Sequence, residues 1–190
     1  MFALLGCMAT TTATNSFVMR LIGAISLDPP IYEEIETDKS ANGQALAVVL
    51  LSSLATGIGA RGFGEVTASG IVFFSMAALL GWVAWALVTF EVGYRLMPQP
   101  QTRADVGELL RTTGFATTPG LFRVFGVMPG ATWPVFAATA IWMLVAMVVA
   151  VRQALDYTST GRAIAVCALG GVLAVAISIV LGLVFGPTLS

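Results

Sequence analysis

Four long apolar runs, at residues 43–60, 66–90, 132–151 and 163–186, constrain this sequence more than any other feature. Each run approaches or exceeds the roughly 20 apolar residues that a helix needs to cross a bilayer core of about 30 Å. Because lipid offers the backbone no hydrogen bonds, such runs must be helical. Only 10% of the 190 residues are charged, against about 25% in soluble domains. We therefore predict an all-α fold, a polytopic membrane helical bundle.

A fifth run, residues 114–130, is apolar but contains Pro119, Gly120 and Arg123. The positions of Lys and Arg indicate whether it crosses, because short cytoplasmic loops carry an excess of these residues. If it crosses, seven of the nine Lys and Arg lie on one side and only Arg61 lies opposite, whereas four crossings would split them six to three. We expect five transmembrane helices, a cytoplasmic N-terminus and an outside C-terminus, although the proline and the arginine also suit a re-entrant hairpin.

A separate N-terminal segment, residues 1–42, precedes the five-helix membrane domain of residues 43–186. Within it, residues 16–27 read "SFVMRLIGAISL" and begin with Ser16, which is suited to cap a helix. The apolar residues fall on one helical face, and the stretch is too short to span a membrane. We expect a short amphipathic helix that lies on the membrane surface or packs against the bundle.

An acidic stretch, residues 28–38, follows that helix and reads "DPPIYEEIETD". Tyr32 and Ile35 give it a small apolar face between the carboxylates of Glu33 and Glu34. Two interpretations remain open. The stretch is a solvated linker, or these four residues dock it on the bundle or on a partner.

Small residues recur at every fourth position in the last two apolar runs. In lipid, close packing of small residues is a main force that joins helices. These stripes either pack the two helices against each other or form an interface with another subunit. The candidate packing residues are Gly170, Ala174, Ser178, Gly182 and Gly186 in the last run, and Ala146 and Ala150 in the run before it.

Three ionisable residues lie close to the hydrocarbon: Glu91, Arg95 and Arg123. Ionisable groups within a membrane are candidates for a functional site. Glu91 and Arg95 are four positions apart, so they share a helical face and can pair. The three residues therefore form either structural contacts or part of an ion path.

The sequence contains no histidine and only two cysteines, Cys7 and Cys167. It thus lacks the commonest metal ligand and the usual general base near neutral pH. The cysteines are too few and too far apart for a metal cluster, and a buried thiol behaves as a small apolar group. We expect no catalytic, cofactor-binding or metal-binding residues, and bound lipids as the only small-molecule ligands.

Three stretches resemble one family when taken in order: "SLDPPIYEEIETD", "RADVGELLRTTGFATTPGLFRVFG" and "IWMLVAMVVAVRQALDYTSTGRAIAVC". With the five-span layout, the chain is similar to the bacterial branch of the Yip (Ypt-interacting-protein) domain family over about residues 16–186. The resemblance implies a cytoplasmic N-terminus, five helices and no established enzymatic activity. Eukaryotic relatives bind prenylated GTPases or shape tubules, often through a long N-terminal tail, and this chain has only about forty residues there.

Together these observations predict a non-enzymatic integral membrane scaffold or organiser, or an accessory subunit of a larger membrane complex. The expected location is the bacterial inner membrane, and the expected partners are membrane lipids and other membrane subunits or further copies of the chain, without nucleic acid. A small transporter or channel, with a path near Glu91, Arg95 and Arg123, is the alternative.

Overall fold

The computed structural model describes residues 15–64, 67–100, 102 and 104–185, and this part of the chain is helical without β-strands. The predicted all-α class is confirmed. The α-helices are α1 (Phe17–Ile25), α2 (Pro29–Thr37), α3 (Ala41–Gly59), α4 (Ala68–Phe90), α5 (Val106–Phe115), α6 (Thr132–Ala154) and α7 (Thr160–Phe185). Between them lie two 3-10 helices, η1 (Ala60–Phe63) and η3 (Thr118–Val127), and a π-helix, η2 (Glu91–Leu96).

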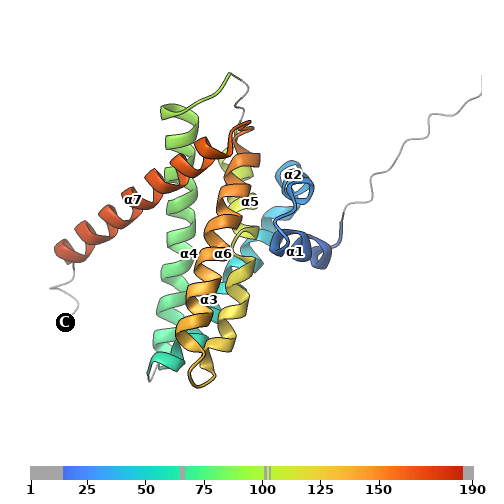
Figure 1. The fold of residues 1–190 in the computed structure, drawn as a ribbon. Helices are drawn as coiled ribbons and strands as arrows, with labels where there is room; N and C mark the ends of the chain where they lie inside the picture. Colours follow the sequence, from blue (N-terminus) through green and yellow to red (C-terminus); the bar gives the residue numbers. More distant parts are fainter. Residues whose placement is uncertain (1–14, 65–66, 101, 103, 186–190) are drawn as a thin grey trace, which may run out of the picture.

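An elongated bundle contains α3, α4, α6 and a rod formed by α5 followed by η3 (Figure 1). We call the end that holds η1 and the turn before α6 the Gly130 end. The opposite end holds η2, the start of α5 and the turn between α6 and α7, and we call it the Tyr157 end.

Three segments of the described chain are long and apolar enough to cross a membrane: Ala41–Phe63, Leu79–Leu96 and Thr132–Ala154. A shorter apolar helical stretch, Thr160–Leu173, belongs to α7. These segments support an integral membrane protein, and the number of five crossings stays a prediction.

The run at residues 114–130 is two helical pieces, because α5 ends at Phe115 and η3 begins at Thr118. Pro119 lies in the first turn of η3, where its missing N–H costs least. The hydroxyl of Thr117 donates to the carbonyl oxygen of Gly114 at 2.7 Å, so a side chain occupies an acceptor at the break. Side-chain hydroxyls of this kind allow a broken helix to exist inside a bundle.

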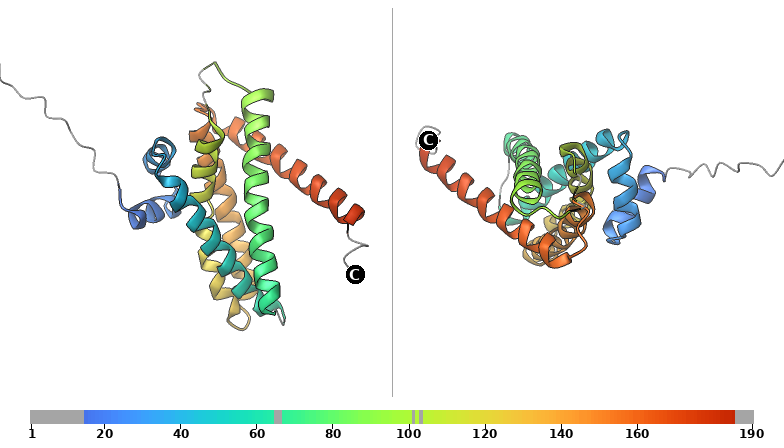
Figure 2. Two further views of the ribbon diagram at one scale, coloured as in Figure 1. Left: turned by 180° about the vertical axis from the view of Figure 1, so that it is seen from behind. Right: turned by 90° about the horizontal axis from the view of Figure 1, so that it is seen from above.

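Helices α1 and α2 form a hairpin on one side of the bundle, which we call the N-terminal hairpin (residues 17–37), whereas α7 runs diagonally away from the bundle (Figures 1 and 2). The hairpin turn contains Leu27 with a φ of 60°, a left-handed conformation that is unusual for leucine. Observed α1 lies within the short helix predicted at residues 16–27.

The tightest helix contact joins α3 to η3 near the Gly130 end. A Cβ atom on Gly59 would lie 1.9 Å from the backbone oxygen of Arg123, and one on Gly120 would lie 2.1 Å from the Oγ of Ser52. No side chain fits at either glycine, so α3 and η3 approach closely there, with backbone against backbone at Gly59. This is the packing that membrane helices use in place of a hydrophobic driving force.

Candidate functional site at the N-terminal hairpin and inside the bundle

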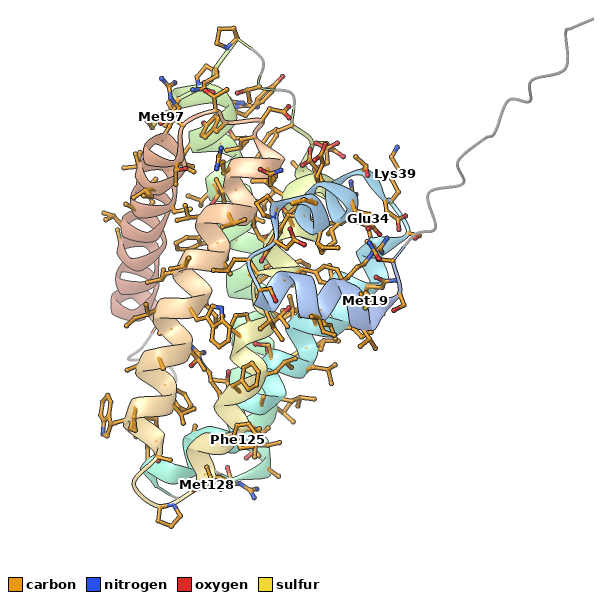
Figure 3. All side chains as sticks on the ribbon, turned by 45° about the vertical axis from the view of Figure 1, so that its right-hand side comes forward. Met19, Glu34, Lys39, Met97, Phe125 and Met128 are labelled. Atoms are coloured by element: carbon orange, nitrogen blue, oxygen red, sulfur yellow. The ribbon has the colours of Figure 1, made fainter. Side chains whose placement is uncertain are left out.

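A fully buried arginine, Arg20, ties the N-terminal hairpin together (Figure 3 shows Glu34 on this hairpin). Its Nη2 lies 2.9 Å from the Oε1 of Glu34 and 2.5 Å from the Oδ2 of Asp38, and its Nη1 donates to the Oε1 of Gln44 at 2.9 Å. One side chain of α1 thereby contacts α2, the connection after it, and α3.

The same contacts control the protonation of the two acids. Burial would raise the pKa of Glu34, but hydrogen bonds from Asn15 and Arg20 outweigh it and the pKa is lowered. Hydrogen bonds from Ser40 and Arg20 lower the pKa of Asp38 to about 2. Both carboxylates are therefore ionised at neutral pH and hold the guanidinium between them.

A second buried arginine, Arg111 of α5, binds the C-terminal end of α2. Its Nε donates to the backbone oxygens of Ile35 and Glu36, each at 3.2 Å, and its Nη1 donates to the Oδ1 of Asn42 at 3.2 Å. Carbonyl oxygens at the end of a helix lack partners and carry partial negative charge, so a cation is well placed there. Arg111 therefore anchors the hairpin to the bundle.

Glu36 lies where α2 meets α5 and the turn between α6 and α7. Burial is the main cause that raises its pKa to about 7, and nearby acids add to the effect while Arg111 opposes it. The acids are Asp156, Glu108 and Glu33. This carboxyl group therefore titrates near neutral pH, unlike those beside Arg20.

The four residues predicted for docking have different environments. Tyr32 and Ile35 are fully buried against the core of this chain, and the hydroxyl of Tyr32 donates to the backbone oxygen of Ala24 at 3.2 Å. Glu34 is held by Arg20, and only Glu33 is exposed. The acidic stretch is thus mostly helix α2 docked on the bundle, with Glu33 left available to a partner.

The apolar side of α1 that faces away from the bundle is exposed. Val18, Met19 and Ile22 are 60%, 52% and 52% exposed. On the other side, the indole N–H of Trp142 donates to the backbone oxygen of Ile25 at 3.0 Å. The helix therefore packs on the bundle with one side and leaves the other exposed.

Glu91 and Arg95 pair with each other at the Tyr157 end. The distance from Arg95 Nη1 to Glu91 Oε2 is 3.0 Å. The side chain of Arg95 is 67% exposed and that of Glu91 is 51% exposed. Arg123 lies toward the Gly130 end, where its Nε donates to Thr139 Oγ1 at 3.2 Å. Thr139 and the end of α6 are separated by about 22 Å of helix. The structure therefore brings Glu91 and Arg95 together without Arg123.

The small-residue stripes of α6 and α7 face different neighbours in the described part of the chain. Ala146 and Ala150 are fully buried and belong to a core with residues of the hairpin, α3 and α5. A Cβ atom on Gly170 would contact the Oγ1 of Thr89 in α4 at 3.4 Å. Ala174, Ser178 and Gly182 lie in α7, but the burial of their side chains is outside the described set. Gly186 lies outside the described residues.

Sequence reasoning missed the two anchoring arginines as candidates. In the sequence, Arg20 and Arg111 were counted only among the Lys and Arg that indicate the topology. A signal existed for Arg20, because Glu34 and Asp38 follow on the adjacent segment. The contact of Arg111 with the end of α2 had no local signal, because the two are separated by 75 and 76 residues.

No group of three or more acid, cysteine or histidine side chains that could hold a metal ion occurs among the described residues. Three apolar segments long enough to cross a bilayer, together with a helical hairpin anchored beside them, define a polytopic helical membrane protein.

A family model, the Yip1 domain, matches residues 22–181. The chain belongs to the Yip1 domain family, a family of membrane proteins not known as enzymes. The resemblance seen in the three sequence stretches is therefore confirmed. No curated protein and no solved structure matches the chain.

Proposed function

We propose that this chain is a non-enzymatic membrane scaffold, an organiser or accessory subunit that binds a partner protein through its N-terminal hairpin. The observation that carries the proposal is the double anchoring of the hairpin by Arg20 and Arg111. A surface that is already rigid loses little conformational entropy when a partner binds. The exposed residues on the outer side of this surface are Asp28, Pro29, Pro30, Glu33 and Thr37.

The chemistry of that surface favours a partner with basic residues. Two carboxylates, Asp28 and Glu33, are exposed on it, while Glu34 and Asp38 are engaged by Arg20. Complementary charge would orient the partner and speed association more than it would tighten binding. Another membrane subunit or a second copy of this chain can supply such a surface.

We further propose the topology of five crossings, with the Tyr157 end in the cytoplasm of a bacterial inner membrane and the C-terminus outside. The distribution of Lys and Arg supports this orientation. Single cysteines placed at Thr158 and at Gly130, on a background without Cys7 and Cys167, test it by labelling with a membrane-impermeant maleimide. Labelling of Gly130 alone in intact cells is expected, and labelling of Thr158 alone would reverse the orientation.

Purification from the native membrane in mild detergent tests the scaffold. A photo-crosslinking residue at Glu33 should capture a partner in stoichiometric amount, whereas the same residue at Glu91, another exposed acid at a different position, should not. A partner captured equally at both positions, or a lone monomer after crosslinking at Glu33, would contradict the proposal. A second copy captured at Glu33 would identify self-association.

A small transporter or channel is the second candidate, and the cavity beside Arg123 favours it. This cavity has a volume of about 230 Å³ and is lined by several hydroxyl side chains. Arg123→Leu distinguishes the two functions. Loss of solute flux in liposomes with assembly retained would support transport, whereas loss of assembly with no flux in either protein would support the scaffold.

A further inference from the structure

Arg123 has hydrogen-bond donors that the protein does not use. A guanidinium carries five N–H groups. Its Nε donates to Thr139 Oγ1 at 3.2 Å and its Nη1 to Thr56 Oγ1 at 3.4 Å, and its Cζ lies 5.3 Å from the ring centroid of Phe136. Three N–H groups therefore have no partner among the described residues, and no carboxylate there pairs with this charge.

The cavity beside Arg123 is lined by hydroxyl groups and carries no negative charge, and three of these hydroxyls already donate to backbone oxygens. Its polar lining residues are Ser52, Ser53, Thr56, Thr117 and Arg123, and none of its lining residues is Asp or Glu. Trp85 also lines it, and the indole Nε1 of Trp85 is buried without a hydrogen-bond partner in the described structure. A cation with unused N–H groups, close to the unpaired N–H of Trp85, is complementary to an anion with several acceptor oxygens, such as a phosphate.

A larger apolar groove adjoins this cavity, because Trp85 lines both. The groove has a volume of about 550 Å³ and lies between α6 and α7. Its lining is almost entirely apolar and includes Leu144, Val148, Ile164 and Val172. A ligand that occupied both spaces would need an anionic group at one end and a hydrocarbon chain at the other.

Along α6, the apolar groove lies further toward the Tyr157 end than Arg123 does. Thr139, which contacts Arg123, lies about 10 Å along α6 from the start of that helix at the Gly130 end. Leu144 and Val148 follow further toward the Tyr157 end. A ligand with its anionic group near Arg123 would therefore have its hydrocarbon chain directed toward the Tyr157 end.

We propose that the cavity beside Arg123 binds the phosphate-containing headgroup of an anionic phospholipid, whose acyl chains occupy the groove between α6 and α7. Arg123 binds the phosphate oxygens, and the Trp85 indole, between the two spaces, donates to the headgroup. The site does not depend on the proposed scaffold function, because the hairpin and the cavity use different residues. A free phosphate shares the headgroup chemistry, so the experiment must separate the two.

Native mass spectrometry of the full chain in detergent provides the test, with phosphatidylglycerol and phosphatidylethanolamine of identical acyl chains. The wild type should retain phosphatidylglycerol preferentially. Arg123→Gln should weaken its retention by about tenfold or more, as expected for loss of a charge-assisted contact. The matched control is Arg61→Gln, which removes the same charge from an exposed residue at the same end and should change retention less than twofold.

Trp85→Phe keeps a ring between the two spaces and removes only the N–H donor, so it should weaken retention by about threefold to tenfold. Trp85→Phe therefore tests the proposed lipid site even if Arg123→Gln fails to fold. Unchanged retention in Trp85→Phe, equal losses in Arg123→Gln and Arg61→Gln, or equal retention of both lipids would overturn the proposal. Displacement of the lipid by millimolar inorganic phosphate would also overturn it, because the site would then select a free anion.

Discussion

The N-terminal hairpin and the Gly130 end of the bundle are held together by different forces. The hairpin depends on charged hydrogen bonds, with Arg20 and Arg111 each in contact with several oxygens. At the Gly130 end, Gly59 allows α3 to touch the backbone of η3. Buried charges are stable only when they are paired and hydrogen-bonded, as in the hairpin, whereas close packing joins helices in lipid without any charge.

The arginines of the two regions show the same contrast. Arg20 is bound by carboxylates and Arg111 by carbonyl oxygens, so both are occupied by the protein. Arg123 has only hydroxyl groups and an aromatic ring as partners in the described chain. An arginine that the fold already saturates acts as an anchor, whereas one with unused donors is available to a ligand.

Replacement of Arg20 by methionine should have the largest effect on stability, and it should act on the hairpin alone. It leaves Glu34 and Asp38 without their cation, and removal of one partner of a buried pair costs about 3–5 kcal/mol. Because Glu34 and Asp38 are 25% and 23% exposed, water can solvate the two unpaired carboxylates in part. We therefore expect the hairpin to lose about 3 kcal/mol of stability, near the lower end of that range.

Limited proteolysis measures this effect, since cleavage within residues 26–40 should become fast in Arg20→Met while the bundle stays intact. Arg61→Met, which removes an exposed arginine, is the control. A hairpin that resists protease equally in the wild type and in Arg20→Met would show that apolar packing alone holds it.

Gly59→Ala tests the packing at the Gly130 end. The new methyl group would meet the Arg123 backbone oxygen at 1.9 Å, so η3 must shift. Overpacking of this kind typically costs about 1–3 kcal/mol. The matched control is Gly43→Ala, at the start of α3, where an added Cβ meets nothing within 4 Å.

Thermal unfolding in detergent should show a lower Tm for Gly59→Ala and an equal or higher Tm for Gly43→Ala, because alanine is the better helix former. Equal changes in the two variants would mean that helix propensity, rather than the α3 to η3 contact, determines the stability of this end.

The fold class followed from the sequence because the length and apolarity of the runs at 43–60, 66–90 and 132–151 leave a lipid-exposed backbone no alternative to helix. Helix α2 was not anticipated. Two prolines after a helix are a common stop signal, yet here they occupy the first positions of a new helix. Local patterns allow both, and only the buried contacts of Tyr32 and Ile35 decide between them.

The surroundings of Arg123 could not be read from the sequence for a different reason. Arg123 was correctly singled out as an ionisable residue near the hydrocarbon, but its partners are 67 and 16 residues away in the chain. Helical spacing relates residues three or four apart, so it linked Glu91 to Arg95 and was silent about Thr56 and Thr139. Contacts between distant helices require the fold.

A change of pH should loosen the hairpin through Glu36. The folded protein raises the pKa of this group from an ordinary value of 4.5 to about 7. The folded state therefore binds more protons than the unfolded state between these values, and stability falls as the pH rises through about 7. Because the group is partly exposed, we expect a loss of about 1 kcal/mol between pH 5 and pH 8.

Chemical unfolding at pH 5 and pH 8 measures this loss, and Glu36→Gln should abolish most of it. The wider environment of Glu36 contains Asp156, Glu108, Glu33 and Arg111. Glu91→Gln, at an exposed position in η2, should leave the pH dependence unchanged. Persistence of the full loss in Glu36→Gln would assign it to another titrating group.

The smallest effect is expected from Arg95→Gln, which breaks the pair with Glu91 at the Tyr157 end. Both side chains are at least half exposed, and exposed pairs four positions apart contribute about 0.3–0.5 kcal/mol. The unfolding free energy should change by no more than that, and the change should disappear in high salt, because exposed charges are screened. A loss of unfolding free energy near that of Arg20→Met would mean that a partner buries Arg95 in the assembled protein. Measuring the effect of Arg95→Gln in purified and in membrane-embedded samples would locate that contact. Charge therefore stabilises this chain only where the fold removes it from water, and exposure separates Arg95 from Arg20 more sharply than the presence of an acidic partner does.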